Sequence, residues 1–156
     1  MSYPTIVVSA DGAPAAALRR AGEVAAATNG RILLVSAYRP VAASRLRAER
    51  REAERGDCPE ELLWMINSQE DVDARLEQAR AQVIDSVPVL TRAHNGGVVE
   101  SVLEAARQEH ADLVVVGTDK KSVMRRGQRR LNGRVAREAD CDVMIVCTDG
   151  YELGSP

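Results

Sequence analysis

Residues 112–134 read DLVVVGTDKKSVMRRGQRRLNGR, and this stretch indicates both the fold and the function of the chain. It predicts a buried, valine-rich strand over residues 112–117, a turn at Gly117, a basic loop and then a helix over residues 130–140. Seven Lys and Arg residues and no acid lie between Lys120 and Arg134, whereas the rest of the chain has 14 basic and 23 acidic residues. A strand-to-helix turn presents backbone N–H groups and the positive end of the helix dipole. The stretch therefore predicts an anion site, most economically one for nucleotide phosphates.

Outside this stretch, short apolar runs alternate with helical patterns. Continuous apolar strands separated by helices indicate a parallel sheet that is covered on both faces. The predicted fold is therefore α/β, a three-layer α/β/α sandwich with a five-stranded parallel sheet. Pro88 indicates that the third strand starts there or lies at an edge. The sequence predicts strands at 5–10, 31–38, 87–93, 112–117 and 142–147, and helices at 13–29, 98–110 and 130–140.

Length and pattern favour one domain. The 156 residues are 45% hydrophobic and 28% charged, which is ordinary for a globular protein. A single domain is predicted over residues 1–150, followed by a C-terminal tail over 151–156. Within the domain, residues 41–68 are expected to form a charged insertion or helical excursion. Its segment 44–55 is either a solvated helix held by Glu–Arg pairs or a loop.

A helix after the insertion is predicted from a capping pattern. Ser68 and Asp71 resemble a capping box, with Asp in place of the usual Glu or Gln. The helix that follows would run to about residue 81. Its apolar stripe would bury Val72, Leu76, Ala79 and Val83.

The sequence carries no signal for a membrane or for an oxidising compartment. No apolar run approaches the ~18 residues that a membrane span needs. The N-terminus leads straight into a strand, without the apolar region of a signal peptide. Cys58, Cys141 and Cys147 are odd in number and widely spaced, which gives neither a disulfide framework nor a metal motif. We therefore expect a cytoplasmic protein with no membrane partner.

Asp11 is the first candidate for ligand binding. It follows the first predicted strand, and in parallel sheets ligands bind beyond the carboxyl ends of the strands, where Ser36 and Gly117 also fall. A carboxylate at this point could accept hydrogen bonds from an adenine amino group or from a ribose. Alternatively, Asp11 is the N-cap of the following helix, a role worth ~0.5–2 kcal/mol.

Other classes of function are disfavoured by composition. A net charge of −2, no Phe, one Trp and three Tyr make a nucleic-acid partner unlikely, because single-stranded nucleic acid is bound by charge together with aromatic platforms. His94 and His110 have no partner pattern for a metal or a triad. No paired carboxylates stand out, so the sequence predicts a binding protein and no catalytic residue, with slow ATP hydrolysis at most. Basic runs are also often simply solvated, and that reading of the loop stays open.

Four stretches resemble the universal stress proteins, small α/β domains of the adenine-nucleotide α-hydrolase-like group. They read TIVVSADGAPAAALRRA, RILLVSAYRP, HADLVVVGT and RRLNGRVAREADCDVMIVCTDG, and together they cover nearly the whole chain. ATP-binding members carry Gly, two residues, Gly, nine residues, then Gly with Ser or Thr. Here the first and last glycines are Gly117 and Gly133, with fifteen residues between them instead of twelve. Lys120 stands at the second glycine and Arg134 replaces the Ser or Thr, while Gly127 partly substitutes at the wrong spacing.

The resemblance implies a stress-response protein that binds ATP or another adenine nucleotide, with Mg²⁺ beside ATP. Asp11 matches the family's nucleotide-facing acid. The altered loop would replace a glycine cradle with Lys and Arg side chains. The rival hypothesis is a nucleotide-independent module that engages an unknown protein through residues 44–55 or the basic loop. Under the first hypothesis, the nucleotide would contact Asp11, Ser36, Val116, Gly117, Lys120, Gly127, Gly133 and Arg134.

A homodimer is also implied by the resemblance. Family members commonly associate through the last strand. Residues 143–146 are apolar enough to serve here, and an exposed strand edge of that kind needs a partner or a cover.

Overall fold

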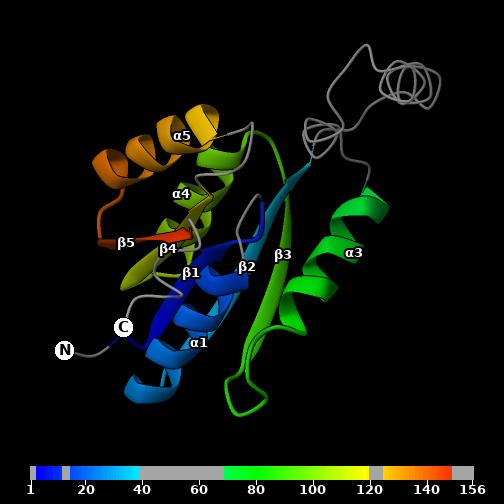
Figure 1. Ribbon diagram of the computed structural model, residues 1–156, viewed down its shortest axis with the longest axis vertical. Coiled ribbons are helices and arrows are strands. Elements are labelled where there is room, and N and C mark those ends of the chain that lie inside the picture. The colour runs from blue at the N-terminus through cyan, green and yellow to red at the C-terminus, as the bar shows by residue number, and fades with distance from the viewer. Residues whose placement is uncertain (1–2, 12–14, 39–68, 120–124, 149–156) are drawn as a thin grey trace.

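A computed structural model of the chain describes residues 3–11, 15–38, 69–119 and 125–148. Strands and helices alternate along it, as Figure 1 shows. The predicted insertion over residues 41–68, which includes the segment 44–55 and Cys58, lies outside the described residues. The elements are β1 (Thr5–Ser9), α1 (Ala15–Thr28), β2 (Arg31–Tyr38), α3 (Gln69–Arg80), β3 (Val89–Asn95), α4 (Val98–Gln108), β4 (Leu113–Asp119), α5 (Arg125–Glu138) and β5 (Asp142–Thr148).

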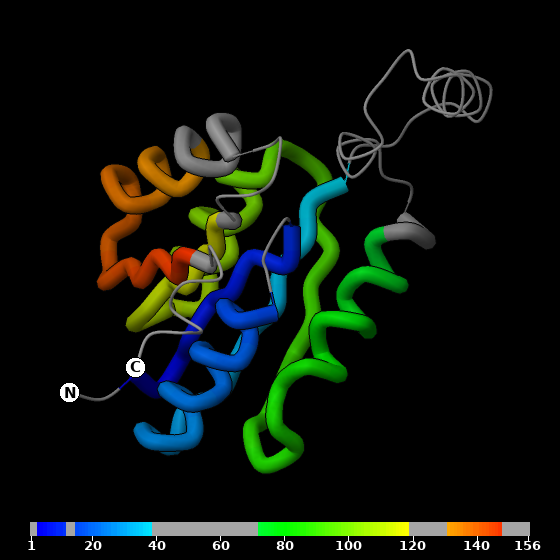
Figure 2. The backbone as a smooth tube through the Cα atoms, viewed as in Figure 1, coloured from blue at the N-terminus to red at the C-terminus, as the bar shows by residue number. Residues whose placement is uncertain are grey.

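The five strands form one parallel sheet in the order β3-β2-β1-β4-β5. The chain first moves outward from β1 to β2 and β3, and then returns to the other side of β1 to add β4 and β5, a path that can be followed in Figure 2. The strand order therefore reverses between β1 and β4. In open α/β sheets such a switch point is where ligands bind, beyond the carboxyl ends of the strands.

Two helical layers bury the two faces of the sheet. Helices α1 and α3 pack on one face, against Ile6, Val8, Leu34 and other residues of the central strands. Helices α4 and α5 pack on the opposite face, where Val7 is part of a second buried cluster. Alternate residues of a strand point to opposite faces, so continuous apolar runs such as that of β1 serve both cores. The predicted α/β/α sandwich is confirmed.

Two helix boundaries are set by local backbone chemistry. Asn29 adopts a left-handed conformation with φ of 55° just after α1 ends. A side chain at Gly30 would come within 2.3 Å of the carbonyl oxygen of Tyr3, so only glycine fits there. Gly96 has φ of 148° and Gly97 is the N-cap of α4, so these two glycines form the turn into that helix.

The predicted helix after the insertion is also confirmed. It is α3, and the apolar residues expected on its buried stripe are packed in the core. β3 begins directly after Pro88 and is an edge strand, as expected from a proline that cannot donate to a central ladder. Among the residues that the structure describes, no helix is long and apolar enough to cross a membrane.

Two predictions about residues 112–134 are wrong. Gly117 does not end its strand in a turn, because it pairs with Val146 inside β4, which continues to Asp119. The helix begins at Arg125 and not at Arg130, so part of the expected basic loop is helical. Residues 125–130 read RRGQRR and have no apolar stripe. They nevertheless extend the helix, because Arg and Gln are good helix formers and outweigh the single glycine.

Candidate functional site

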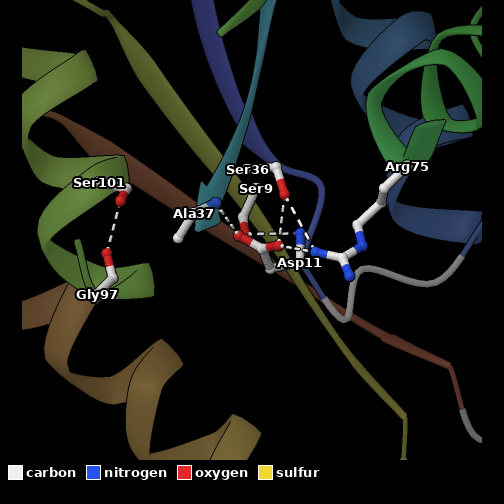
Figure 3. A network of polar contacts seen from close by, with 7 residues as sticks. All are labelled: Ser9, Asp11, Ser36, Ala37, Arg75, Gly97 and Ser101. Carbon is white, nitrogen blue, oxygen red and sulfur yellow. Dashed lines mark hydrogen bonds and ion pairs between the residues drawn. The ribbon is translucent and has the colours of Figure 1, made fainter. Parts of the chain in front are cut away.

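A buried polar cluster lies around Asp11, at the carboxyl end of the central strand β1. The Asp11 side chain is only 2% exposed. Its Oδ1 accepts a hydrogen bond from the Ser36 hydroxyl at 2.6 Å, and its Oδ2 accepts one from the backbone N–H of Ala37 at 2.7 Å. The Arg75 guanidinium donates to the same Oδ1 at 2.7 Å (Figure 3). A buried carboxylate is thus held by two fixed donors and one cation.

Three elements meet to build this cluster. Asp11 follows β1, Ser36 and Ala37 belong to the last residues of β2, and Arg75 comes from α3. Ser36 points to the same face of the sheet as Leu34, because the two are two residues apart on one strand. That face is covered by α3, so the guanidinium reaches both Asp11 and the Ser36 oxygen, the latter at 3.3 Å.

The cluster bears on the two expectations for Asp11. Its carboxylate contacts β2 and α3, and the described part of α1 begins four residues later, at Ala15. Residues 12–14 lie outside the described residues, so the prediction that Asp11 caps this helix stays a prediction. Asp11 and Ser36, both expected to face a ligand, are brought into direct contact.

On the other side of the switch point, β4 and α5 bring the two outer glycines of the motif close together. The Asn132 side chain is 3% exposed and donates to the Gly117 carbonyl at 3.0 Å. Asn132 precedes Gly133 on α5, so this bond fixes the helix against the end of β4. Gly117 therefore lies beside the helix although fifteen residues separate it from Gly133.

The early start of α5 changes which residues stand at its N-terminus. The first four N–H groups of an α-helix have no partner within the helix. Gly127 is the third residue of α5 and belongs to that group, whereas Gly133 lies eight residues after Arg125, about 12 Å along the helix axis. Of the predicted phosphate contacts, Gly127 has the position suited to an anion, and Lys120 lies outside the described residues.

Arg134 contacts acids in the structure. Its Nε donates to Glu138 at 3.0 Å and its Nη2 to Glu100 of α4 at 3.3 Å. The hydrogen bond that Arg134 donates to Glu138, and then the negative charge of Glu138, raise the pKa of Arg134, so the guanidinium stays charged. Both ion pairs are exposed and therefore easily exchanged with solvent or with another anion.

Val116 and Ser36, expected to line one adenine slot, have side chains on opposite faces of the sheet. Val116 is packed in the core beneath α4 and α5, while Ser36 faces α3. A ligand at the carboxyl edge could therefore meet Val116 through its backbone and Ser36 through its hydroxyl.

Sequence reasoning did not identify Arg75 or Asn132. Arg75 carried a usable signal, because it lies three residues after Val72 and one before Leu76, on the apolar stripe of α3. A lone charge on a buried stripe indicates a buried partner. Asn132 gave no comparable signal, since a polar residue in a polar helix is ordinary.

A second polar region lies at the opposite, amino end of the sheet. A cavity of about 280 Å³ is lined by Leu103, Arg107, His110, Glu138, Cys141 and neighbouring residues. Burial, and then the charges of Asp142, Asp112 and Asp140, raise the pKa of the Cys141 thiol. Helices α4 and α5 both end at this cavity. The carbonyl ends of helices and nearby carboxylates repel anions, so the cavity is unsuited to a phosphate.

In the described ranges, His94 makes a local structural contact, and the histidines and acids form no metal site. His94 Nδ1 lies 3.1 Å from the Ser101 hydroxyl. That hydroxyl donates to the Gly97 carbonyl at 2.6 Å (Figure 3), so His94 and Ser101 stabilise the start of α4. Within these ranges, no group of three or more His, Cys, Asp or Glu side chains could hold a metal ion.

Comparison with solved structures shows proteins of the same architecture. A universal stress protein crystallised in complex with cAMP is 27% identical, with a TM-score of 0.64 over 96% of this chain and 100% of that one. A universal stress protein family member from Burkholderia pseudomallei is 25% identical, with a TM-score of 0.53 over 92% and 96% of the two chains. A universal stress protein from Archaeoglobus fulgidus, solved with dAMP, is 16% identical and shows the fold alone, with a TM-score of 0.56 over 94% and 99%.

A search of curated protein sequences found no match. The sequence profile of the universal stress protein family, in contrast, matches residues 2–146. That match spans the first strand, the buried cluster at Asp11 and the last strand. The chain therefore belongs to the universal stress protein family.

Proposed function

We propose that this protein binds an adenine nucleotide, ATP or a related one, at the carboxyl end of the sheet, where β1 and β4 flank the switch point. The observation that carries the proposal is the buried Asp11 carboxylate, which the Ser36 hydroxyl and the Ala37 N–H fix in place. A fixed carboxylate at this position in an α/β fold suits the hydroxyl groups of a ribose. A structural neighbour of 27% identity that was crystallised with cAMP supports the adenine nucleotide class.

The phosphates would lie toward α5. Gly117 allows close approach of the chain to a ligand, and the free N–H groups around Gly127 and the positive end of the helix dipole favour an anion there. Lys120, Gly133 and Arg134 remain proposed contacts. Arg134 would exchange its exposed ion pairs with Glu100 and Glu138 for the phosphate, a change that costs little. Mg²⁺ would accompany ATP and offset its charge.

Calorimetric titration with ATP, AMP and cAMP tests the proposal. Asp11→Asn keeps the size of the side chain and removes its charge, and we expect it to weaken binding at least tenfold. Asp112→Asn is the matched control, because the Asp112 carboxylate also accepts a backbone N–H, from Thr5 at 3.0 Å, but at the amino end of the sheet. Absence of heat from folded wild-type protein, or equal loss in both variants, would contradict nucleotide binding at Asp11.

We further propose a cytoplasmic, homodimeric protein that is not a catalyst. The exposed edge of β5 supports the dimer, because Ile145 in that strand is 47% exposed and a strand edge readily pairs with another. Charge at this position should separate the subunits. Light scattering after size exclusion should show a dimer for wild type and a monomer for Ile145→Arg, with Leu90→Arg on the opposite edge strand as control. Leu90 is exposed to a similar extent.

A further inference from the structure

Among the donors to the Asp11 carboxylate that the described residues supply, the Arg75 guanidinium is the replaceable one. Ser36 is completely buried and Ala37 donates through its backbone, so neither can leave without moving β2. Arg75 is carried on a long, flexible stem from α3, and its side chain is 22% exposed. Since the Asp11 carboxylate is only 2% exposed, a ligand that reaches it has to take the place of a group that now covers it.

Departure of Arg75 would leave two neighbouring acceptors. The guanidinium Nη1 lies 2.7 Å from Asp11 Oδ1 and 3.3 Å from the Ser36 oxygen. These two oxygens are 2.6 Å apart, because the Ser36 hydroxyl donates to Asp11. The Ser36 oxygen can still accept a hydrogen bond, since a hydroxyl has two lone pairs. The pair therefore suits two donors that are held side by side.

A ribose with both hydroxyl groups free presents such donors. Its 2′- and 3′-hydroxyls are on adjacent carbons and on the same face of the ring, so each can donate to one of the two oxygens. A guanidinium on a carboxylate is a charge-assisted contact, and a single neutral hydroxyl replaces it poorly. Two hydroxyls restore the contacts that Arg75 makes with Asp11 and Ser36.

We propose that Arg75 occupies the ribose subsite of the ligand-free protein and that a nucleotide binds by exchanging the guanidinium for its two ribose hydroxyls. This inference rests on the proposed nucleotide site and adds to it a residue that sets affinity and ligand choice. Arg75 then acts as an internal competitor. The apparent affinity for the nucleotide is the intrinsic affinity multiplied by the fraction of molecules in which Arg75 has left Asp11. Removal of the side chain should raise affinity for ligands with a ribose diol.

Calorimetry with ATP and 2′,3′-dideoxy-ATP tests the exchange. Arg75→Met keeps most of the stem and removes the donors, and we expect ATP to bind about tenfold more tightly than to wild type, as for a competitor that is released about a tenth of the time. Dideoxy-ATP, which has no ribose hydroxyl, should gain nothing. Arg80→Met is the matched control on the same helix, because Arg80 contacts Glu77 and the Val89 carbonyl and not Asp11.

The outcomes separate this inference from the proposed function. If wild type binds ATP through Asp11 but Arg75→Met binds it equally or more weakly, Arg75 is not a competitor and the inference fails alone. An equal gain in affinity for dideoxy-ATP would also overturn the inference, because the gain would then not depend on the ribose hydroxyls. If neither wild type nor Arg75→Met binds ATP, the proposed function is wrong, and this inference, which rests on it, is wrong as well.

A second variant covers the case in which Arg75→Met does not fold. Arg75→Lys keeps a positive charge near the buried Asp11, but its shorter side chain carries a single ammonium group in place of the guanidinium whose Nη1 contacts both Asp11 Oδ1 and the Ser36 oxygen. We expect this variant to bind ATP a few-fold more tightly than wild type and to leave dideoxy-ATP unchanged. No gain with ATP would overturn the exchange.

Discussion

The two ends of the parallel sheet both gather polar groups, but they do so in opposite ways. At the carboxyl end one acid, Asp11, is buried and satisfied by Ser36, Ala37 and Arg75. At the amino end several acids surround the Cys141 thiol beside a cavity of about 280 Å³. The open cavity is thus at the end where helices α4 and α5 terminate and several acids lie near Cys141, and the organised donors and acceptors are at the other end.

The presence of a cavity is therefore not enough to identify a nucleotide site. Phosphates are favoured by helix N-termini and disfavoured by helix C-termini. The cavity lies where α4 and α5 end, whereas α5 begins beyond β4, next to the switch point of the sheet. Strand direction and helix polarity therefore place the candidate site at the carboxyl end, where the side chains are closely packed.

The largest effect is expected at the buried acid. Asp11→Ala removes the acceptor for Ser36, Ala37 and Arg75 and leaves a partly buried cation without its carboxylate. We expect the free energy of unfolding to fall by about 3 kcal/mol. Urea unfolding measures this change. Asp85→Ala, at an exposed acid, should leave the midpoint unchanged, and a similarly small change at Asp11 would show that its cluster does not hold the carboxyl end together.

A smaller loss is expected where α5 is fixed to β4. Asn132→Ala removes the donor to the buried Gly117 carbonyl, which should lower stability by about 1–2 kcal/mol. Asn132→Asp should be worse, because a carboxylate oxygen would face the carbonyl oxygen. The melting temperatures of the two variants, measured by thermal unfolding, show which of them is less stable. If the aspartate variant is as stable as the alanine one, this bond does not position the helix.

Arg134 tests whether the phosphate side of the carboxyl end works through side chains. Arg134→Gln should leave the unfolding midpoint unchanged, because its ion pairs with Glu100 and Glu138 are exposed. It should weaken ATP binding several-fold and leave adenosine binding unaltered. Calorimetry with both ligands measures the difference. An unchanged ATP affinity would assign the phosphates to backbone groups of α5 instead.

The smallest effect is expected at the amino end. Burial and the neighbouring aspartates raise the pKa of Cys141, so at pH 8 a smaller fraction of it is thiolate than in an unstructured peptide. Iodoacetamide should therefore label Cys141 a few-fold more slowly in the folded protein than after denaturation. The difference between the two labelling rates should become smaller as pH rises. Peptide mass spectrometry measures the rates. Labelled protein should still bind nucleotide, and loss of binding would move the site to the cavity.

Much of the fold could be predicted because it depends on local patterns. Apolar runs such as that of β2 and the stripe of α3 report burial directly, and Pro88 reported an edge strand. The errors fell at Gly117 and at the start of α5. Both lie where a polar segment has no periodicity, so strand pairing with β5 and helix propagation decided the boundaries.

Part of the candidate site could also be predicted. Asp11 and Ser36 were expected at the carboxyl ends of β1 and β2, and the structure joins them. Arg75 was not expected as a partner, because 64 residues separate it from Asp11. The opposite orientations of Val116 and Ser36 likewise depend on which helices cover which face.

Composition and periodicity are enough to predict the order of elements, the parallel sheet and the concentration of positive charge between Lys120 and Arg134, because these patterns extend over a few neighbouring residues. The contact of Arg75 with Asp11, and those of Arg134 with Glu100 and Glu138, become visible only in the packed molecule. Such contacts join distant segments, and their geometry is set by how α3 and α5 pack on the sheet. Local sequence patterns indicate which polar residues are candidates, and the packing of the helices on the sheet sets which residues they contact.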